Sequence, residues 1–443
     1  PLRRDGALAP GERVALVMPV HNEDPEQVFR HLRATAHDLD RTGLAGRFDV
    51  VLLSDTTDPA IRSAEDRYMA AWRALDRDPD RLTLRRRQIR AGFKAGNIRA
   101  FVDAPESQAY AYMVVLDADS VMRGPAVERL VGTLAANPGV GIVQALAVGL
   151  PAPSAFARIF QFGMRHGMLP HTLGAAWWQG DAGPYWGHNA ALRMSAFRAA
   201  CRLPTLPGRS PLAGAILSHD QVEAAQMRAH GYGVRVLALE AGSYETNPPT
   251  LPDFIKRDLR WCQGNLQYLK LLARPGFRFM GRLQLAQAVA MYLAAPCWLA
   301  FVVLGVLQLS LPGTAATQPL VAGMGAALPQ AAWGVGLLAT MLGMTFAPKL
   351  LGYAHALLDR ERRHAFGGAR PVFAGMGAEI AASLVLGPVV MVAQSVFIAG
   401  LPFGRTVAWG AQARGGRRLP WRTAWRGLWP QAALGLLGTG VLA

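Results

Sequence analysis

The chain is short of charged residues and of cysteine. Only 17% of its 443 residues are Asp, Glu, Lys or Arg, whereas 51% are hydrophobic, and both values are unusual for a soluble protein. Its three cysteines, Cys201, Cys262 and Cys297, are far apart and match no metal-binding spacing. We therefore expect isolated free thiols in a reducing compartment.

Common nucleotide-binding and RNA-binding motifs are also missing. No GxGxxG and no Walker A motif occurs, which disfavours a dinucleotide site and an NTPase. Acidic residues are outnumbered, 30 against 46 Lys and Arg, giving a formal net charge of +16. Such a charge suits nucleic acid, anionic lipid or an anionic substrate. Because the arginines are dispersed, we expect no nucleic acid, and an anionic membrane surface is the simpler partner.

The apolar residues gather in the second part of the chain. Residues 1–282 are mixed in character, whereas 283–443 are mostly apolar, with charges in a few clusters. This division predicts a soluble catalytic domain, 1–282, followed by a transmembrane helical domain, 283–443. The chain lacks an initiator Met and stops inside the apolar run GLLGTGVLA, so we expect it to be part of a longer chain with further membrane helices.

Strands and helices are expected to alternate in the first 150 residues. Strands are predicted at 14–20, 48–55, 82–87, 111–117 and 140–146, and helices at 25–37, 59–77, 92–102 and 127–137. This alternation predicts βαβ units, and hence an α/β domain with a mainly parallel sheet and helices on both faces.

The apolar run AYMVVLDADS ends in two carboxylates, Asp117 and Asp119. Ligands of parallel sheets bind outside the carboxyl ends of the strands, where two oxygen donors could hold a divalent cation against a diphosphate. The alternative is an ordinary turn. Since the segment HNE follows the first strand and Asp55 ends the second, three strand ends converge on polar groups, which favours a site for metal and nucleotide.

Seven short segments, in order, resemble the motifs of the processive family 2 glycosyltransferases, which include cellulose, chitin and hyaluronan synthases. They are PVHNE (19–23), SD (54–55), KAGN (94–97), DAD (117–119), GPYWGHNAALR (183–193), SHD (218–220) and RDLRWCQGN (257–265). The resemblance covers most of residues 12–270 and implies a GT-A fold and a nucleotide-sugar donor.

Two positions depart from the family pattern. Arg257 stands where the family has Gln, and His219 where it has Glu. With these variants the chain most resembles the branch that makes osmoregulated periplasmic glucans. That resemblance implies UDP-glucose as the donor, a growing β-1,2-linked glucan as the product, and acyl carrier protein as a suggested partner.

The resemblance also assigns roles to residues. Mg²⁺ or Mn²⁺ would bind Asp117 and Asp119, and Asp220 would deprotonate the acceptor hydroxyl as it attacks. Asp55 would accept a hydrogen bond from the uracil ring. The implied donor site comprises Val20, Glu23, Asp55, Lys94, Asp117 and Arg260.

Aromatic and histidine side chains are candidates for the acceptor site. Trp261 and Trp186 could stack on a sugar ring, or they could pack in the core. His188 is a candidate hydrogen-bond partner for a hydroxyl. His219 could shift its pKa or bind substrate, or it could be a surface or packing residue.

Residues 154–169 have apolar side chains at helical spacing, interrupted by basic ones. They predict an amphipathic helix on the membrane face, with Trp177 and Trp178 as anchors near its end. An ordinary soluble helix would show the same periodicity.

Two stretches, 284–311 and 331–358, are long enough to span a bilayer, and Pro348 should bend the second. The loop 312–330 has no Lys or Arg, whereas 359–371 is rich in Arg. The positive-inside rule therefore places 312–330 outside and the catalytic domain in the cytoplasm. The resemblance implies that the membrane is the bacterial inner membrane.

A third apolar stretch, 376–401, conflicts with this topology, because a single crossing would place the Arg-rich 404–426 outside. We therefore predict an interfacial helix or a re-entrant hairpin. By resemblance, 406–412 stands where a gating loop covers the nucleotide, with Trp409 as its aromatic residue. The alternative is a linker held at the lipid headgroups.

The apolar stretches predict a membrane-embedded protein, and the resemblance implies an inverting, processive glucosyltransferase. A cellulose-type β-1,4 synthase and a lipid glycosyltransferase are alternatives within the enzyme class. A transporter with a nucleotide-sensing domain is the non-enzyme alternative, and it is disfavoured because no span has a central acidic residue.

Overall fold

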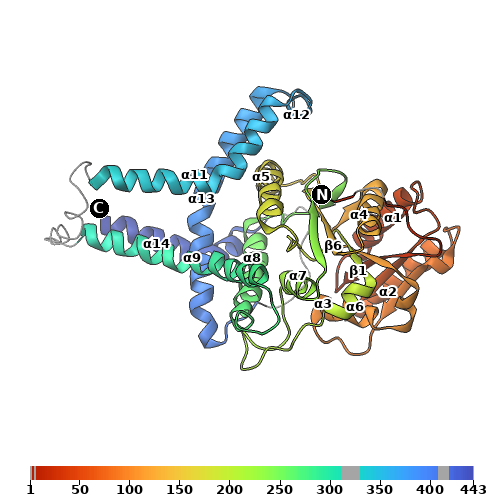
Figure 1. Cartoon of the computed structure of the whole chain (residues 1–443). Coiled ribbons are helices and arrows are strands. Elements are labelled where there is room, and N and C mark those ends of the chain that lie inside the picture. The colour runs from red at the N-terminus through yellow and green to blue at the C-terminus, as the bar shows by residue number, and fades with distance from the viewer. Residues whose placement is uncertain (1, 4–5, 311–329, 408–418, 443) are drawn as a thin grey trace.

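A seven-stranded sheet forms the centre of the N-terminal part of the molecule (Figure 1). The computed structural model describes residues 2–3, 6–310, 330–407 and 419–442. The strands are β1 (Val14–Val20), β2 (Phe48–Ser54), β3 (Leu82–Arg86), β4 (Tyr112–Val115), β6 (Val140–Ala145), β8 (Ala190–Arg193) and β9 (Gly233–Leu237). Their order is β3-β2-β1-β4-β8-β6-β9. All neighbours pair in parallel except β8, which is antiparallel to β4 and β6.

Helices cover both faces of this sheet, and each face has its own hydrophobic core. One core contains α1 (Pro25–Leu39), α2 (Pro59–Arg73) and α4 (Gly124–Ala136), and the other contains α3 (Phe93–Val102), α6 (Met194–Ala200) and α7 (Asp220–Ala229). In β1, Leu16 and Met18 enter the first core, whereas Ala15 and Val17 enter the second. Successive side chains of a strand point to opposite faces, so the whole strand is apolar. The predicted α/β fold is confirmed.

The helices after β1 and β2 begin in the same way. Pro25 and Pro59 lie in the first helical turn, where a missing N–H costs no hydrogen bond. The preceding Asp24 and Asp58 cap the helices by accepting hydrogen bonds from backbone N–H groups two residues on. Since each helix begins soon after its strand, the loops after β1 and β2 are short. Their polar residues therefore stay at the carboxyl edge of the sheet.

Some predicted boundaries and several strands differ from the structure. β4 ends at Val115 and not at residue 117, and α2 ends at Arg73 and not at residue 77. β8, β9 and a second small sheet were not predicted, because strands of two to five residues are too short to show a pattern. The small sheet has the order β5 (Val121–Met122), β10 (Ser243–Glu245) and β7 (Val148–Gly149).

The three cysteines are free thiols, as predicted. Cys201 and Cys262 are buried, and burial raises the pKa of both thiols, whereas Cys297 is exposed. The two buried residues are therefore held in the unreactive thiol form.

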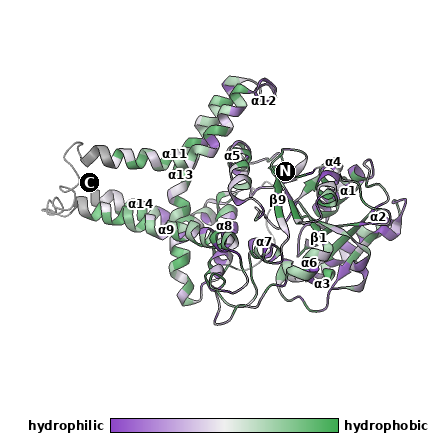
Figure 2. Cartoon of the chain, viewed as in Figure 1, coloured by the Kyte–Doolittle hydropathy of each residue, from purple (hydrophilic) through white to green (hydrophobic). Residues whose placement is uncertain are grey.

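Long apolar helices lie beyond the sheet domain, and Figure 2 shows their hydrophobic colouring. α9 (Phe279–Ser310), α11 (Gln330–Leu358) and α13 (Ala369–Gly400) are long and apolar enough to cross a membrane. The first two correspond to the predicted spans. Pro348 lies inside α11, and Figure 1 shows this helix bent, as expected.

α13 is one continuous helix, so the predicted re-entrant hairpin is wrong. The Gly387–Pro388 pair, which could have formed a turn, lies inside the helix without ending it. α13 runs crosswise to α9 and to the first part of α11 (Figure 1). Its length and composition suit a span, but a course crosswise to its neighbours suits the interfacial alternative better, and we propose that alternative for α13.

α5 (Ala155–Gln179) contains the predicted amphipathic stretch and continues beyond it. It packs against α11 and α13, and Trp177 near its end is 86% exposed. Its partners are thus the apolar helices, which favours the membrane-facing interpretation of this helix over that of an ordinary soluble one.

The end of the described chain is basic and aromatic. α12 (Arg360–Ala365) is a short basic helix, and α14 (Trp421–Leu442) runs beside α9 (Figure 1). α14 begins with three exposed tryptophans spaced by four residues, hence on one face, and an arginine follows each of the first two. The tryptophans are Trp421, Trp425 and Trp429.

The apolar helices meet at a polar cluster. Glu379 of α13 is buried, forms an ion pair with Lys349 of α11, and accepts hydrogen bonds from Tyr353 (2.8 Å) and Ser383 (2.7 Å). This carboxylate lies towards the start of α13 rather than at its centre. Because all its partners come from α11 and α13, the cluster joins these two helices.

Candidate active site

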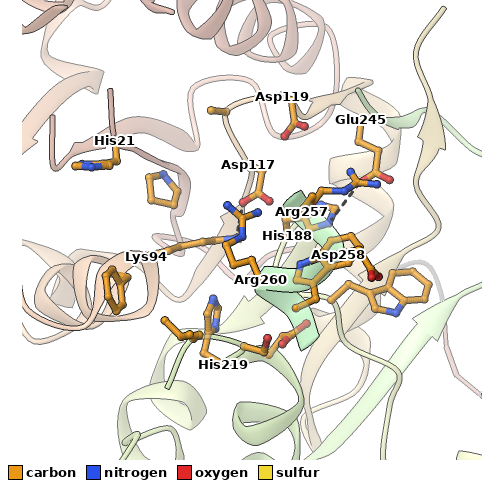
Figure 3. Close-up of a pocket in the computed structure, with 18 of the residues that line it drawn as sticks. His21, Lys94, Asp117, Asp119, His188, His219, Glu245, Arg257, Asp258 and Arg260 are labelled. Carbon is orange, nitrogen blue, oxygen red and sulfur yellow. Dashed lines mark hydrogen bonds and ion pairs between the residues drawn. The ribbon is translucent and has the colours of Figure 1, made fainter. Parts of the chain in front are cut away.

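A cavity of about 780 Å³ opens between the carboxyl edge of the sheet and helices α5, α8 (Leu251–Leu266) and α9 (Figure 3). Every predicted site residue within the described chain lines it. Trp409, the predicted gating residue, lies outside the described residues. The residues brought together are Val20, Glu23, Asp55, Lys94, Asp117, Asp119, Trp186, His188, Asp220, Arg260 and Trp261.

Asp117 and Asp119 lie in a tight turn after β4. The N–H of Ser120 donates to the carbonyl of Asp117 (2.9 Å), and the Ser120 hydroxyl accepts from the N–H of Asp117 (3.1 Å). The two interpretations of this stretch, a turn and a site, therefore both apply, because the turn presents two carboxylates to the cavity.

Both carboxylates have polar partners in the protein. Lys94 pairs with Asp117 and also donates to the carbonyl of Gly187 (2.8 Å). The hydroxyl of Thr246 donates to Asp119 Oδ2 (3.2 Å). Lys94 thus joins α3, the turn after β4 and the loop before β8, three segments that are far apart in the sequence.

The acid pair suits a divalent cation that is bound together with phosphate. Mg²⁺ and Mn²⁺ prefer oxygen ligands, and Mg²⁺ commonly takes one or two carboxylates and completes its coordination with water and substrate phosphates. Among the described residues, no group of three or more His, Cys, Asp and Glu side chains could hold a metal ion. Asp117 and Asp119 therefore fit such an ion only with phosphate and water as its other ligands.

Asp55 is held by an arginine that the sequence analysis missed. Arg87 donates to both carboxylate oxygens of Asp55, at 2.9 and 2.7 Å, and both side chains are buried. A carboxylate offers about four acceptor positions, so the pair can still accept from a ligand. Arg87 follows β3, the neighbour of β2, and the meeting of parallel strand ends at one edge is the signal that could have identified it.

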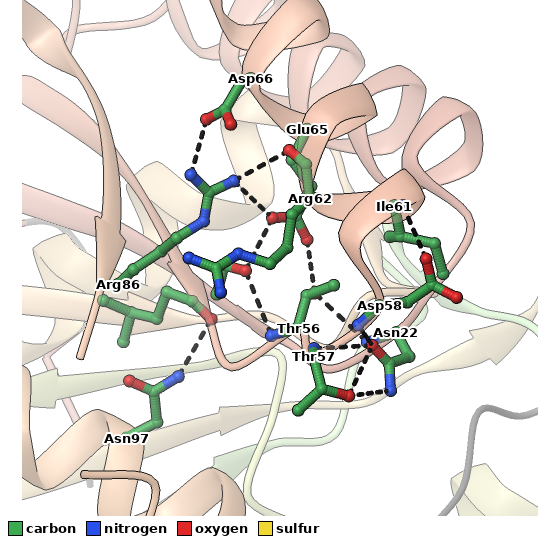
Figure 4. Close-up of polar contacts among 12 residues, drawn as sticks. Asn22, Thr56, Thr57, Asp58, Ile61, Arg62, Glu65, Asp66, Arg86 and Asn97 are labelled. Atoms are coloured by element: carbon green, nitrogen blue, oxygen red, sulfur yellow. Dashed lines mark hydrogen bonds and ion pairs between the residues drawn. The ribbon is translucent and has the colours of Figure 1, made fainter. Parts of the chain in front are cut away.

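A buried network fixes the turn after Asp55 (Figure 4). Glu65 of α2 accepts hydrogen bonds from the hydroxyls on either side of Asp55, at 2.7 and 2.6 Å, and pairs with Arg86 (2.9 Å). Asn22 accepts from two backbone N–H groups of the same turn, at 2.9 and 3.0 Å. The loops after β1 and β2 are thereby locked to each other beside the cavity.

Asp220, the predicted base, is the first residue of α7. Gly187 passes closely over it: a Cβ at this glycine would lie 3.3 Å from the Cβ of Asp220 and 3.4 Å from His219 Cε1. Its φ of 78° also lies in the left-handed region that favours glycine. The loop that carries Trp186 and His188 is therefore held against the start of α7.

His219 is buried, with 7% of its surface exposed, so its interpretation as a surface residue is wrong. Its Nδ1 lies 2.9 Å from Oε2 of Glu223. Burial lowers the pKa of His219, but the charge and hydrogen bond of Glu223 outweigh burial, and the net effect raises the pKa.

Helix α8 holds the segment in front of Asp220. Gln267, just after the helix, accepts from the N–H of Leu217 (2.9 Å), and the Tyr268 hydroxyl donates to the carbonyl of Ser218 (2.7 Å). Gly264 packs so closely on Ser218 that any side chain there would collide with it. The helix that carries Arg260 and Trp261 therefore also positions the predicted base.

Trp261 is 44% exposed and lines the cavity, so packing in the core is wrong for this residue. The guanidinium of Arg257 lies 4.7 Å from the centre of its ring. The Arg257 that departs from the family pattern thus covers the indole of Trp261 in a cation–π contact.

His188 and Asp258 have acidic and polar neighbours that were not predicted. His188 Nε2 lies 3.5 Å from Glu245, and burial raises the pKa of that carboxyl. Asp258, whose pKa burial also raises, accepts from Gln394 of α13 (2.8 Å). Glu245 lies in a three-residue strand without a sequence signal, whereas Asp258 lies inside the recognised motif and could have been considered.

One wall of the cavity is apolar. It is formed by side chains of α5, α8 and α9, and the sequence analysis did not predict it. The residues are Phe160, Met164, Met168, Phe254 and Met291.

Comparison with known protein families gives two matches. The model described as glycosyl transferase family group 2 matches residues 112–347, and that of glycosyl transferase family 2 matches 15–200. Together they include every segment that lines the cavity.

Curated relatives and solved structures extend the comparison. Glucans biosynthesis glucosyltransferase H of Rhodopseudomonas palustris (strain TIE-1) is 40% identical over 97% of this chain, and that of Caulobacter vibrioides (strain NA1000 / CB15N) is 36% identical over 93%. This chain covers 60% and 63% of those two proteins, so it spans about three fifths of their length. A mannosyltransferase from Pyrobaculum calidifontis, solved with GDP-mannose and Mn²⁺, matches 86% of this chain and 90% of its own at 19% identity and a TM-score of 0.46.

Proposed function

This chain belongs to glycosyltransferase family 2 and has its α/β GT-A fold, and on that premise we propose that it is a membrane-embedded, inverting, processive glucosyltransferase. Its donor would be UDP-glucose, and its product the β-1,2-linked backbone of osmoregulated periplasmic glucans. One observation carries the proposal: a single cavity gathers the acid pair after β4, Asp220 at the start of α7, and Arg260 with Trp261 on α8.

The donor would lie along the sheet edge. Val20, Glu23 and Asp55 line the part of the cavity next to β1 and β2 and would contact the uridine. Lys94 and Arg260 would place fixed positive charge at the diphosphate, where negative charge grows as UDP leaves. Mg²⁺ or Mn²⁺, held by Asp117 and Asp119, would add further neutralisation when bound.

The acceptor hydroxyl would be activated by Asp220. Its oxygen forms a bond to the anomeric carbon on the side opposite UDP, the bond from that carbon to the phosphate oxygen breaks, and Asp220 takes the hydroxyl proton. A carboxylate is a weak base towards a free hydroxyl, so proton transfer occurs as the attack makes that proton acidic. The anomeric configuration is thereby inverted.

The acceptor end of the growing glucan would lie between Trp261, Trp186 and His188. The exposed face of an indole ring packs well on the apolar face of a sugar. Because Arg257 covers Trp261 on one side, the sugar has the other side available. His188 would hydrogen-bond a sugar hydroxyl.

We further propose a location at the bacterial inner membrane, with the catalytic domain from 1 to 282 in the cytoplasm and the helices of 283–443 in the bilayer. UDP-sugars are cytoplasmic, and the basic α12 suits the cytoplasmic side. Acyl carrier protein is a proposed partner.

The experiment is a transfer assay on membranes that contain the chain. Radiolabelled UDP-glucose is added with Mg²⁺ or Mn²⁺, and the product is sized and its linkage determined by methylation analysis. A β-1,2-linked polymer supports the proposal. A β-1,4-linked polymer would indicate a cellulose-type synthase, a labelled lipid a lipid glycosyltransferase, and no transfer a binding or transport function.

A further inference from the structure

Two buried side chains beside Asp220 are not used by this mechanism. Glu223 lies one turn further along α7 than His219, and only 3% of its surface is exposed. In the described part of the chain, its ion-pair partner is His219, whose Nδ1 lies 2.9 Å from Oε2. An ionised carboxylate that is removed from water needs such a partner, because desolvation of an unpaired charge is strongly unfavourable.

The contact determines the orientation of the imidazole. Glu223 is an acceptor when ionised, so Nδ1 of His219 carries the proton of this hydrogen bond. The opposite edge of the ring, with Cε1 and Nε2, faces Gly187, at 3.4 and 3.7 Å from the position that a Cβ would take there. Figure 3 shows the ring of His219 directed towards the cavity that it lines.

The charged groups around His219 come from two helices. Glu223 and Asp220 of α7 favour the imidazolium, whereas Lys94 of α3 opposes it, and the net effect raises the pKa of His219 in spite of burial. In the imidazolium, Nε2 also carries a proton and can only donate.

From this geometry, and resting on the glucosyltransferase function proposed above, we propose that Glu223 is a positioning residue. It would hold His219 as a hydrogen-bond donor to the acceptor sugar, at the hydroxyl next to the one that Asp220 deprotonates. The pair of residues, one accepting and one donating, is matched to a vicinal diol.

The two roles, hydrogen-bond donor and base, belong to residues that are adjacent in the chain. His219 and Asp220 follow each other in the chain and both line the cavity, so their polar atoms can meet neighbouring hydroxyl groups of one ring. In this proposal His219 donates and keeps its proton, whereas Asp220 accepts one. His219, which departs from the family pattern, is thus paired with the acid Glu223 one helical turn later.

The pair makes transfer depend on pH in a defined direction. A group with a raised pKa stays protonated until the pH passes that pKa, and transfer that needs the donor is lost above it. Glu223→Gln removes the charge that raises the pKa, so the alkaline limb of the rate should move to lower pH.

The test measures His219 directly and through catalysis. The exchange of the imidazole C2 proton, followed by mass spectrometry across pH, gives the titration midpoint of His219 without any activity. In parallel, kcat/KM for the acceptor is measured across pH in membranes. Glu223→Gln should lower both the midpoint and the alkaline limb, because it removes the charge that raises the pKa of His219.

The controls separate this role from simple stabilisation. Glu128→Gln is the matched substitution on α4, where Oε1 accepts from the N–H of Gly43 (2.8 Å) far along the chain from His219, and it should move neither quantity. His219→Gln keeps a neutral donor, so it should retain part of the activity without an alkaline limb. His219→Leu should raise the acceptor KM, with UDP affinity unchanged.

The outcomes that overturn the proposal are distinct from failure of the proposed function. An unmoved midpoint or an unmoved limb in the Glu223 variant, or a normal acceptor KM in His219→Leu, removes the positioning role. If the unaltered chain transfers no glucose from UDP-glucose, the function itself fails, and the sugar-binding role of His219 fails with it.

Discussion

Asp220 begins a helix, whereas the acid pair follows a strand, and this difference separates their chemistry. The first turn of α7 has unsatisfied N–H groups, which stabilise a negative charge. We assign the role of base to the carboxylate in that place. Asp117 and Asp119, in the turn after β4, are suited to binding instead.

Replacing Asp220 should therefore abolish transfer and leave binding intact. We expect Asp220→Asn to lower kcat by about 10²- to 10⁴-fold, the usual contribution of a general base. UDP affinity with Mg²⁺, measured by calorimetry, should stay unchanged, because the proposed donor contacts are elsewhere. Near-normal turnover of this variant would show that the base is another group.

Replacing Asp119, in contrast to Asp220, should weaken the binding of UDP with Mg²⁺. Asp119→Asn removes a charged oxygen from the acid pair, so UDP should lose the gain in affinity that Mg²⁺ gives it. Calorimetric titration with UDP, in Mg²⁺ and in EDTA, measures that gain. The effect is reciprocal by linkage, so UDP should equally strengthen Mg²⁺ binding by the unaltered chain. Equal UDP affinity with and without Mg²⁺ in the unaltered chain would remove the metal from the proposal.

For single residues, the sequence motifs identified most of the candidate site. They could not show which side chains form pairs in space. Lys94, Asp117 and Asp220 could be named because each belongs to a recognisable segment. Arg87 and Glu223 were not named, since their pairing with Asp55 and His219 becomes visible only in three dimensions. Arg257 was visible only as a departure, and its contact with Trp261 gives that departure a physical reason.

Helices α5 and α11 pack on each other at Gly352, where there is no room for a side chain. A Cβ at this glycine would lie 1.7 Å from the backbone carbonyl oxygen of His166. The contact is with backbone and not with a flexible side chain, so the two helices would have to separate to admit a methyl group.

Gly352→Ala should destabilise the protein for this reason. Overpacking typically costs about 1–3 kcal/mol, so the melting temperature in detergent should fall. Gly343 lies in the same helix with nothing within 4 Å of its Cβ position. Gly343→Ala should be neutral or stabilising, since alanine favours helices by up to about 1 kcal/mol over glycine. Equal melting temperatures for the two variants would contradict the close packing of α5 on α11.

Elements were predictable where their pattern was long. β1, β2 and β3 are apolar runs bounded by turn residues, and their predicted ranges agree closely with the structure. β8 and β9 were missed because four or five residues carry too little periodicity. The hairpin in 376–401 was predicted from the Arg-rich segment after it and not from a turn signal, and α13 is continuous.

In the molecule as a whole, α13 differs in direction from the other long apolar helices. α9, α14 and the first part of α11 extend away from the sheet domain, whereas α13 runs across them (Figure 1). If the first group spans the bilayer, α13 lies along its surface, and the Arg-rich segments before and after it can share the cytoplasmic side.

Cysteine labelling tests this topology. In a Cys297→Ala background, which removes the exposed thiol, Thr317→Cys should react with an impermeant reagent from outside the cell membrane. Arg363→Cys, in α12, should react only after permeabilisation. Thr317 lies outside the described residues, so labelling is the direct measurement of its side. Labelling in the opposite order would invert the membrane orientation and place the cavity outside.

The basic, tryptophan-lined start of α14 makes the surrounding lipid a ligand of the folded state. Arg422 and Arg426 lie beside the exposed Trp421 and Trp425, a combination that suits anionic headgroups. Whatever binds the folded chain and not the unfolded one stabilises it by mass action. In nanodiscs, the melting temperature should therefore rise with the fraction of anionic lipid, and Arg422→Gln with Arg426→Gln should flatten that rise. The stability of this protein would then be a property of its membrane as much as of its sequence.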